Sequence, residues 1–130
     1  MLAETDEIDD PIVELLKSLL DGHITLSRRL AEKSHYPPID IGASVSRVAD
    51  QIMAGDALDA AHLIRRYFAE FDEARPMVES GIYRAGSNPA IDRAIALQPR
   101  IAAFLRQGAG EESDRAPTDK AMARIVEAMA

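Results

Sequence analysis

The chain has 130 residues, a formal net charge of −7 and no cysteine, and 47% of its residues are hydrophobic. These values predict one soluble folded domain with a modest core, and they exclude disulfides and thiolate metal sites. The acidic balance disfavours contact with nucleic-acid phosphates, although Arg28–Arg29 and Arg65–Arg66 are basic pairs. The sequence contains no apolar run of membrane-spanning length and no targeting segment, so a cytoplasmic location is the default expectation.

A first helix is predicted after the acidic lead-in. Asp10 is a suitable capping residue, and Pro11 suits the first helical position, where a backbone N–H is not needed. The apolar residues between Ile12 and Leu20 form a wide stripe, so we expect this helix to be buried along much of its length. Gly22 is expected to end the helix in the left-handed conformation.

A short strand is predicted at residues 23–27, where apolar and polar residues alternate. Its backbone needs a partner, and the alternation of Ile39 and Ile41 is the best candidate. Ser27 is expected to cap a short helix over Arg28–Lys33.

The next segment should be extended, and Ile39 to Ser46 should continue irregularly or as a strand before the chain becomes helical. Residues 35–38 are expected to be extended, because a residue before proline is disfavoured in the helical region. Arg47 is expected to open a helix that runs to about Ala54, with Val48 and Ile52 directed inward.

A long amphipathic helix is predicted from Ala57, which Pro76 breaks or restarts and Gly81 ends. One face of this helix carries Leu58, Ala61, Ile64, Phe68 and Phe71. Asn88 and Pro89 indicate the start of another helix, which Pro99 should kink. Its apolar stripe consists of Ile91, Ala94, Ile95, Gln98, Ile101, Ala102 and Leu105.

A polar linker is predicted at residues 108–116, and a last helix that either docks or frays begins at Pro117. The chain has no phosphate-cradling loop of the GxxxxGK[ST] type, no GxGxxG and no HExxH. Its carboxylate pairs, Asp9/Asp10 and Asp56/Asp59, are explained by helix capping and solvation. The residues alone therefore indicate a mostly helical domain that cannot run a reaction by itself.

Three stretches carry a specific resemblance: DDPI with SLLDGHITLSRRLAE, then HYPPIDIGASVSR, and later GIYRAGSNPAIDRAIALQPRIAAFLRQ. In this order they resemble the segment that follows the nucleotide-binding core in the export ATPases of bacterial flagella and type III secretion systems. Those proteins are homohexameric relatives of the rotary ATP synthase catalytic subunits. The last stretch favours the export branch but does not separate flagellar from virulence-type systems.

The resemblance implies a mainly α fold, in which a helical bundle is preceded by a short β-containing remnant of the RecA-like nucleotide-binding domain. Residues 1–47 would be the tail end of that domain, with a helix, a short strand and an arginine-finger loop. Residues 48–107 would form the C-terminal helical domain, and residues 108–130 a linker and a terminal helix. Since the family's phosphate loop is missing, we expect a C-terminal piece that is inactive alone.

Arg47 closes the SVSR run, and the resemblance implies that it reaches the nucleotide of the neighbouring subunit. A planar, permanently charged guanidinium can spread positive charge over the oxygens of a phosphoryl group in transfer. The residues themselves leave an alternative open, in which Arg47 pairs with Asp50 on the next helical turn.

Two tyrosines correspond by resemblance to aromatic residues of the adenine pocket. Tyr36 precedes a Pro-Pro pair, whose stiff backbone suits a stacking platform, although packing beneath the strand is an equal alternative. Tyr83 corresponds to a second aromatic that comes from the helical domain. Stacking reads base shape weakly, so we expect loose nucleotide specificity.

The resemblance also implies ATP with Mg²⁺ in the full-length parent, with neither expected to be bound tightly by this chain. The expected partners are other subunits of a hexamer, a coiled-coil stalk protein, secretion chaperones and cargo, without nucleic acid. The implied location is cytoplasmic and peripheral at the inner-membrane export apparatus.

Two other readings stay open at the level of sequence. One is a stand-alone helical interaction module or regulator without enzymatic activity, for which the Met start and the acidic lead-in are the only support. The other is a different hexameric relative, such as an ATP synthase subunit or an RNA-translocating factor, although the acidic charge disfavours RNA. The gene sequence upstream of Leu2 would separate a piece of an ATPase from an independent module.

Overall fold

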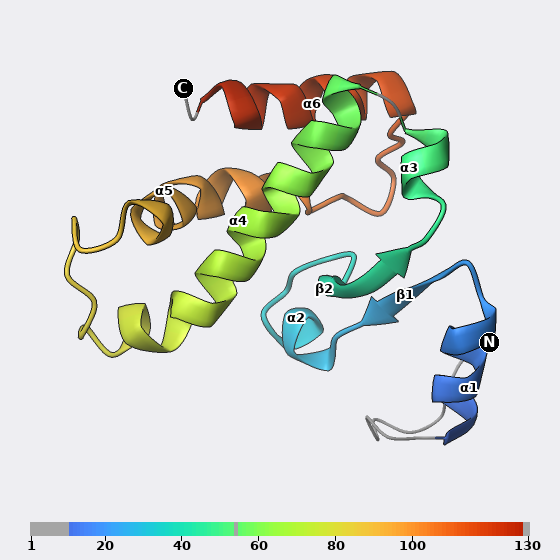
Figure 1. The fold of residues 1–130 in the computed structure, drawn as a ribbon, viewed down its shortest axis with the longest axis horizontal. Coiled ribbons are helices and arrows are strands. Elements are labelled where there is room, and N and C mark those ends of the chain that lie inside the picture. The colour runs from blue at the N-terminus through green and yellow to red at the C-terminus, as the bar shows by residue number, and fades with distance from the viewer. Residues whose placement is uncertain (1–10, 54, 129–130) are drawn as a thin grey trace.

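The computed structural model describes residues 11–53 and 55–128, in which it contains two bodies (Figure 1). Helices α4, α5 and α6 form one body, and α1, α2 and a two-stranded sheet form the other, with α3 between them. The prediction of a mainly α fold with a short β-containing segment is therefore confirmed. In chain order the elements are α1 (Pro11–Leu19), β1 (Gly22–Leu26), α2 (Arg28–Glu32), β2 (Ile39–Ser46), α3 (Ala49–Ile52), α4 (Asp56–Glu79), α5 (Pro89–Phe104) and α6 (Arg115–Glu127).

Strands β1 and β2 pair in antiparallel fashion, which confirms the predicted pairing with the stretch that begins at Ile39. The register joins Leu26 to Ile39 at one end and Gly22 to Ser46 at the other. Between the pairs Thr25–Asp40 and His23–Val45, residues 41–44 of β2 face only residue 24 of β1. Strand β2 therefore bulges away from its partner.

Side chains stabilise this bulge. Asp40 Oδ1 accepts hydrogen bonds from the backbone N–H groups of Gly42 at 3.0 Å and Ala43 at 3.1 Å. The buried hydroxyl of Ser44 accepts from the Thr25 N–H at 3.0 Å and donates to the Asp40 carbonyl at 2.6 Å. The Ser44 hydroxyl thus replaces backbone bonds that the bulge removes from the ladder.

Gly22 has a different role from the predicted one, because it begins β1 and does not end α1 in the left-handed conformation. A β-carbon at Gly22 would lie only 2.5 Å from the carbonyl oxygen of Val45. That oxygen belongs to the backbone of β2, so it cannot move aside without disturbing the pair. The glycine is needed for close approach of the two strands.

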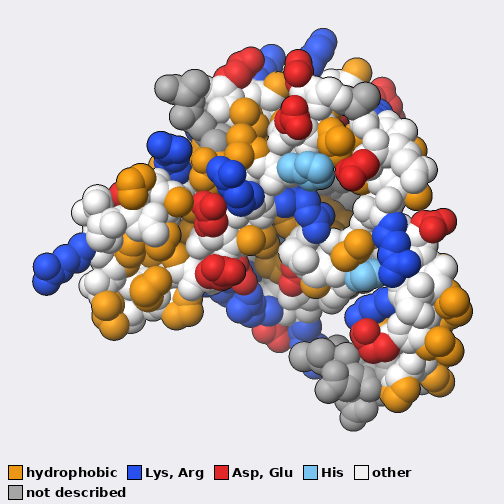
Figure 2. Space-filling view, in the orientation of Figure 1, with side chains coloured by type: hydrophobic (Ala, Val, Ile, Leu, Met, Phe, Trp, Pro, Cys, Tyr) orange, Lys and Arg blue, Asp and Glu red, His pale blue; other side chains and the backbone are white. Residues whose placement is uncertain are grey.

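The apolar stripe of α1 is exposed, so the prediction that this helix is buried along much of its length is wrong. Leu19 is 72% exposed, and Ile24 on the adjoining strand β1 is 71% exposed. Hydrophobic side chains accordingly line the outer edge of the molecule where α1 lies, at the lower right of Figure 2. The periodicity identified an apolar face, but it carries no information about which surface covers that face.

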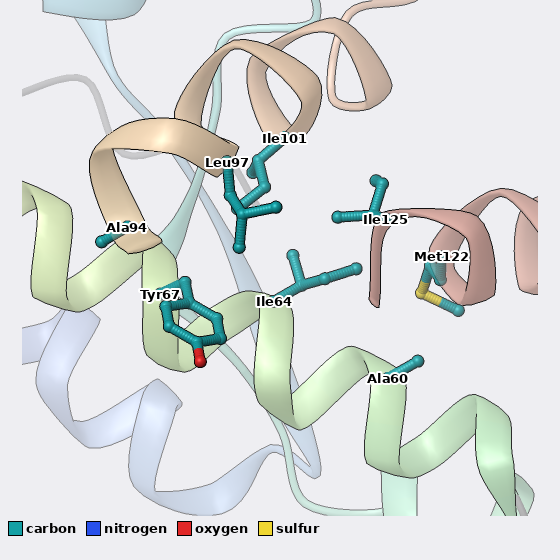
Figure 3. Packing of buried hydrophobic residues seen from close by; sticks show 8 residues of the cluster. All are labelled: Ala60, Ile64, Tyr67, Ala94, Leu97, Ile101, Met122 and Ile125. Atoms are coloured by element: carbon teal, nitrogen blue, oxygen red, sulfur yellow. The ribbon is translucent and has the colours of Figure 1, made fainter. Parts of the chain in front are cut away.

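The core lies where α4, α5 and α6 cross (Figure 3). The terminal helix α6 docks on α4 through Met122 and Ile125, which decides between docking and fraying. It begins at Arg115, two residues before the predicted start at Pro117. The buried cluster consists of Ala60, Ile64, Tyr67, Ala94, Leu97, Ile101, Met122 and Ile125.

Helix α4 runs through Pro76 to Glu79, so the prediction that Pro76 breaks or restarts the helix is wrong. Residue 76 has no N–H to bond to the carbonyl four residues earlier, so α4 lacks one backbone hydrogen bond there and continues for three more residues. The buried face also differs from the predicted one. Ile64 is buried as predicted, but the other predicted residues are half-buried, and Tyr67 is the large buried residue that the sequence reading missed.

The ends of the helices follow local sequence signals. Gly81 has a φ of 72°, and the N–H groups of Gly81 and Ile82 bond to the carbonyls of Val78 and Met77, which closes α4 as predicted. Asn88 caps α5 by accepting from the Ala90 N–H at 2.9 Å. Ser27 occupies the N-cap position of α2, but its side chain makes no capping bond within the described part of the chain.

Two predictions concern residues outside the described ranges, namely the cap at Asp10 and the helix end at Ala54.

Among the helices that the structure describes, we find none that combines the length and apolar character needed to cross a lipid bilayer.

Substitution of Gly22 by alanine tests the close approach of the strands. We expect Gly22→Ala to lower the free energy of unfolding by about 1–3 kcal/mol, because the new methyl group overlaps a backbone oxygen. Gly110→Ala is the matched control, since nothing lies within 4 Å of a β-carbon there, and it should change stability by less than about 1 kcal/mol. Urea unfolding followed by circular dichroism measures both values, and equal stabilities would contradict the role assigned to Gly22.

Candidate functional site

Arg47 lies in the bend between β2 and α3, and its side chain is exposed. Its backbone N–H donates a 2.7 Å hydrogen bond to the carbonyl of Asp21, next to the strand pair Gly22–Ser46. The register of the two strands therefore fixes the point from which the Arg47 side chain leaves the backbone.

Arg47 does not open a helix, because α3 begins two residues later at Ala49 and ends at Ile52. Ile52, which was predicted to point inward, is 61% exposed. Helix α3 is a single turn, and a single turn has too few positions to bury one face against the core. The prediction of a helix from Arg47 to about Ala54 is thus wrong at its start, and its predicted end falls on an undescribed residue.

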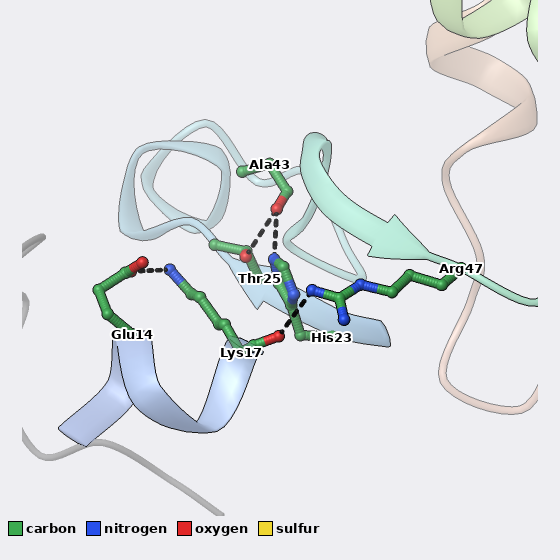
Figure 4. Close-up of polar contacts among 6 residues, drawn as sticks. All are labelled: Glu14, Lys17, His23, Thr25, Ala43 and Arg47. Carbon is green, nitrogen blue, oxygen red and sulfur yellow. Dashed lines mark hydrogen bonds and ion pairs between the residues drawn. The ribbon is translucent and has the colours of Figure 1, made fainter. Parts of the chain in front are cut away.

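The Arg47 guanidinium lies against the C-terminal turn of α1 (Figure 4). Its Nη1 donates to the carbonyl of Ser18 at 3.2 Å, and its Nη2 donates to the carbonyl of Lys17 at 3.3 Å. A cation is favoured at this end of a helix, where carbonyl groups lack helical partners. Both distances are at the long end of the range for N–H···O bonds, and the guanidinium is exposed. These two hydrogen bonds can therefore be replaced by stronger bonds to another acceptor.

The alternative partner of Arg47 is engaged elsewhere. Asp50 lies with its Oδ1 3.6 Å from Nε2 of His62 on α4. An Arg47–Asp50 ion pair is therefore wrong for this structure.

The strands beside Arg47 are also joined by side chains. His23 Nε2 and Thr25 Oγ1 both donate to the Ala43 carbonyl, at 3.0 and 3.2 Å (Figure 4).

Tyr36 has a fixed backbone and an exposed side chain. Its carbonyl accepts a 2.9 Å hydrogen bond from the N–H of Gln107, just beyond the end of α5, and its peptide bond to Pro37 is cis. The residue is 54% exposed, which does not agree with the alternative of packing beneath the strand. The ring therefore offers a face to solvent from an anchored position.

Tyr83 lies in a different part of the molecule. Its hydroxyl is 3.0 Å from the Asn88 carbonyl and 3.0 Å from Asp92 Oδ1, and Asp92 also accepts from the N–H of Gly86. These bonds tie the loop between α4 and α5 to the first turn of α5. Tyr36 is anchored at the other end of the same 16-residue helix, which is about 24 Å long. The structure therefore does not bring the two tyrosines together within one chain.

A cavity of about 70 Å³ lies between α2, α4 and α5, next to the segment that carries Tyr36. His35 forms part of its wall, together with Arg75 and the aromatic rings of α4. Burial lowers the pKa of His35 below 6.5, and the nearby positive charge of Arg106 lowers the pKa further. The residues that line the cavity are Leu30, His35, Tyr67, Phe68, Phe71, Arg75, Gln98, Ile101, Ala102 and Leu105.

The sequence reading missed two arginines that join the helical body to the segment around Arg47. Arg65 Nη2 on α4 donates to the Ser44 carbonyl at 2.7 Å, and Arg115 Nη2 on α6 donates to the Ile52 carbonyl at 2.8 Å. Backbone carbonyls accept bonds at every position, so no sequence signal could have identified these two acceptors.

Comparison with known families divides the chain at about the position of Arg47. Residues 53–124 match the family described as the T3SS EscN ATPase C-terminal domain. Residues 1–46 match the nucleotide-binding domain of the ATP synthase alpha/beta family. These matches agree with the resemblance that was seen in the sequence, including its export branch.

Individual relatives give the same result. A flagellum-specific ATP synthase of Salmonella typhimurium is 43% identical over 114 residues, which are 88% of this chain and 25% of that protein. The assembled ATPase EscN of the enteropathogenic E. coli type III secretion system has a TM-score of 0.89 and 35% identity, covering 96% of this chain and 30% of EscN. EscN in complex with its central stalk EscO has a TM-score of 0.83 and 34% identity, and the match covers 89% of this chain and 29% of that EscN chain. The chain thus spans about a quarter of the length of the curated relatives it matches.

The lowered pKa of His35 predicts a pH dependence of stability. The unfolded chain binds a proton at His35 at a higher pH than the folded chain does, so stability falls as the pH drops below 6.5 toward the lowered value. We expect His35→Gln to flatten the dependence of the unfolding free energy on pH between pH 7.5 and 5. Arg106→Gln should raise the pKa of His35 in an NMR titration, and an unchanged slope in His35→Gln would contradict the assignment.

Proposed function

This chain belongs to the family of type III secretion ATPase C-terminal domains, and we propose that it is the C-terminal part of a homohexameric ATPase that energises protein export. The export machinery would be a flagellar or a type III secretion apparatus, since relatives of both kinds match the chain. The observation that carries the proposal is the arginine at the end of β2, which is exposed and fixed at its backbone.

Arg47 would act as an arginine finger on the nucleotide of a neighbouring subunit. Its guanidinium is bonded only to two neutral carbonyls among the described residues, at 3.2 and 3.3 Å. Phosphoryl oxygens would be better acceptors, because a charge-assisted hydrogen bond is roughly twice as strong as a neutral one. The chain itself has no phosphate-cradling motif, so the nucleotide must be held elsewhere.

We also propose that the chain divides after Arg47. Residues 1–47 would complete a nucleotide-binding domain, residues 48–107 would form the helical domain, and residues 108–130 would follow as linker and terminal helix. The two family matches support this division. The exposed apolar stripe of α1 also supports it, because the rest of a nucleotide-binding domain would supply the missing cover.

Tyr36 would form one wall of an adenine pocket, since its ring is exposed and its backbone is anchored to the end of α5. Tyr83 is proposed as a second contact, but its hydroxyl is bonded at the far end of α5. It could face the same nucleotide only from another subunit or after a large rearrangement. The bound species in the full-length protein would be ATP with Mg²⁺, and this chain alone should not hydrolyse it.

The proposed partners are other copies in a hexamer, a coiled-coil stalk protein, secretion chaperones and cargo. The similarity to EscN, which was solved both assembled and in complex with its stalk EscO, supports the first two. The corresponding location is cytoplasmic, at the periphery of the membrane-embedded export apparatus.

Substitution of Arg47 in the full-length hexamer tests the finger role. We expect Arg47→Ala to lower kcat for ATP hydrolysis by about 10³-fold or more, because the positive charge acts on the transition state. Nucleotide binding, measured with a fluorescent ATP analogue, should change little. Arg47→Lys should recover only part of the activity, since an ammonium cannot replace the planar fork.

Mixed hexamers decide whether Arg47 acts between subunits. Subunits with Arg47→Ala are mixed with subunits whose phosphate loop is inactivated. Some sites then combine the intact phosphate loop of the first kind with the intact Arg47 of the second kind, and these sites should be active. Hydrolysis by Arg47→Ala at close to the normal rate would overturn the role. Arg93→Ala, on an exposed position of α5, serves as the charge-matched control and should retain normal activity.

Substitution of Tyr36 tests the adenine wall. We expect Tyr36→Ala to raise KM for ATP about 10-fold with a smaller effect on kcat, because stacking on an aromatic ring contributes about 1–3 kcal/mol. Tyr36→Phe keeps the ring and should behave like the parent. Equal KM values for ATP in all three proteins would count against contact with the base.

A further inference from the structure

Two arginine side chains of the helical body form hydrogen bonds to the backbone on either side of Arg47, one before it and one after it in the chain. Arg65 on α4 donates to the Ser44 carbonyl at 2.7 Å, three residues before Arg47. Arg115 on α6 donates to the Ile52 carbonyl at 2.8 Å, five residues after Arg47. Both bonds are shorter than those of Arg47 itself, and both acceptors are backbone atoms that move with the Arg47 segment.

Other contacts also join the two bodies. Helix α3 is a single turn, and it is held by the Asp50–His62 contact at 3.6 Å and by Met53, the residue after it, which packs against the core. Elsewhere the two bodies meet where α4 packs against β2, through Tyr36–Gln107, through a long Arg29–Asp72 contact of 3.8 Å, and around the cavity beside His35. The two arginine–carbonyl bonds are short hydrogen bonds that join the helical body to the backbone on either side of Arg47.

We propose that Arg65 and Arg115 are positioning residues for Arg47, which convert the orientation of the helical body into the placement of the Arg47 guanidinium. This inference rests on the proposed function of Arg47. Each arginine fixes one flank of the segment, so a displacement of α4 or α6 moves Ser44 or Ile52 and carries Arg47 with it. Neither Arg65 nor Arg115 needs to contact nucleotide for this effect.

The proposal has a defined kinetic consequence. A reacting group that is displaced by about 1 Å can lose about 10²-fold in rate, although substrate still binds. Loss of either bond should therefore lower kcat and leave KM nearly unchanged. It should have no effect once Arg47 has been removed, because there is then no guanidinium to position.

The experiment uses the full-length hexamer with Arg65→Ala, Arg115→Ala and the double variant, each with and without Arg47→Ala. We expect each single substitution to lower kcat about 10-fold and the double substitution to lower it about 10²-fold, with KM for ATP within twofold. In the Arg47→Ala background the same substitutions should lower kcat less than twofold. Arg65→Lys and Arg115→Lys can still donate to a carbonyl and should recover part of the rate.

The outcomes are separable. If Arg47→Ala lowers kcat but Arg65→Ala and Arg115→Ala do not, the positioning role is wrong and the finger role stands. If both lower kcat by the same factor with and without Arg47, they act through folding or assembly, and the inference is wrong; melting temperature and hexamer formation identify that case. If Arg47→Ala itself has normal kcat, the proposed function fails before the inference is reached. Arg93→Ala is the control that should change none of these values.

Discussion

The apolar face of α4 is the constraint on which the rest of the structure depends. This 24-residue helix packs against α5, α6 and β2, and it contributes Ala60, Ile64 and Tyr67 to the buried cluster. A long helix with one apolar face gains stability only if other elements cover that face. Helices α5 and α6 do so, and the polar side of α4 is left to reach the sheet through Arg65. The fold of the helical body and its attachment to the Arg47 segment thus come from two sides of one helix.

The sequence was informative where the structural cause is local. Asn88 with Pro89 and Gly81 identified a helix start and a helix end, because capping depends on a few adjacent residues. Tertiary packing overrode other patterns. Helix α4 continues through Pro76, its buried face includes the unpredicted Tyr67, and Gly22 serves close strand approach. The stripe of α1 was recognised as apolar, but its environment was not, since periodicity describes a face and not its cover.

For the candidate site, the sequence indicated which arginine to consider but not which atoms it contacts. The motif around Arg47 directed attention to an arginine that proves to be exposed at a strand end. Its actual contacts are the carbonyls of Lys17 and Ser18, about 30 residues away in sequence, and the bracketing arginines also bond to carbonyls. Such contacts arise from the fold alone, because every residue offers the same backbone acceptor. The residue types that form a site can therefore be read from sequence, whereas the bonds that hold it cannot.

Helix α5 gives the molecule a mechanical property. Its first turn is bonded to the loop at Tyr83, and the residue just beyond its last turn is bonded to Tyr36. Helix α5 is about 24 Å long, so a tilt of the whole helix by about 10° about one end would displace the other end by about 4 Å. The loop between α4 and α5 and the backbone of Tyr36 are thus tied to opposite ends of one helix, and a change in the tilt of α5 would move one relative to the other.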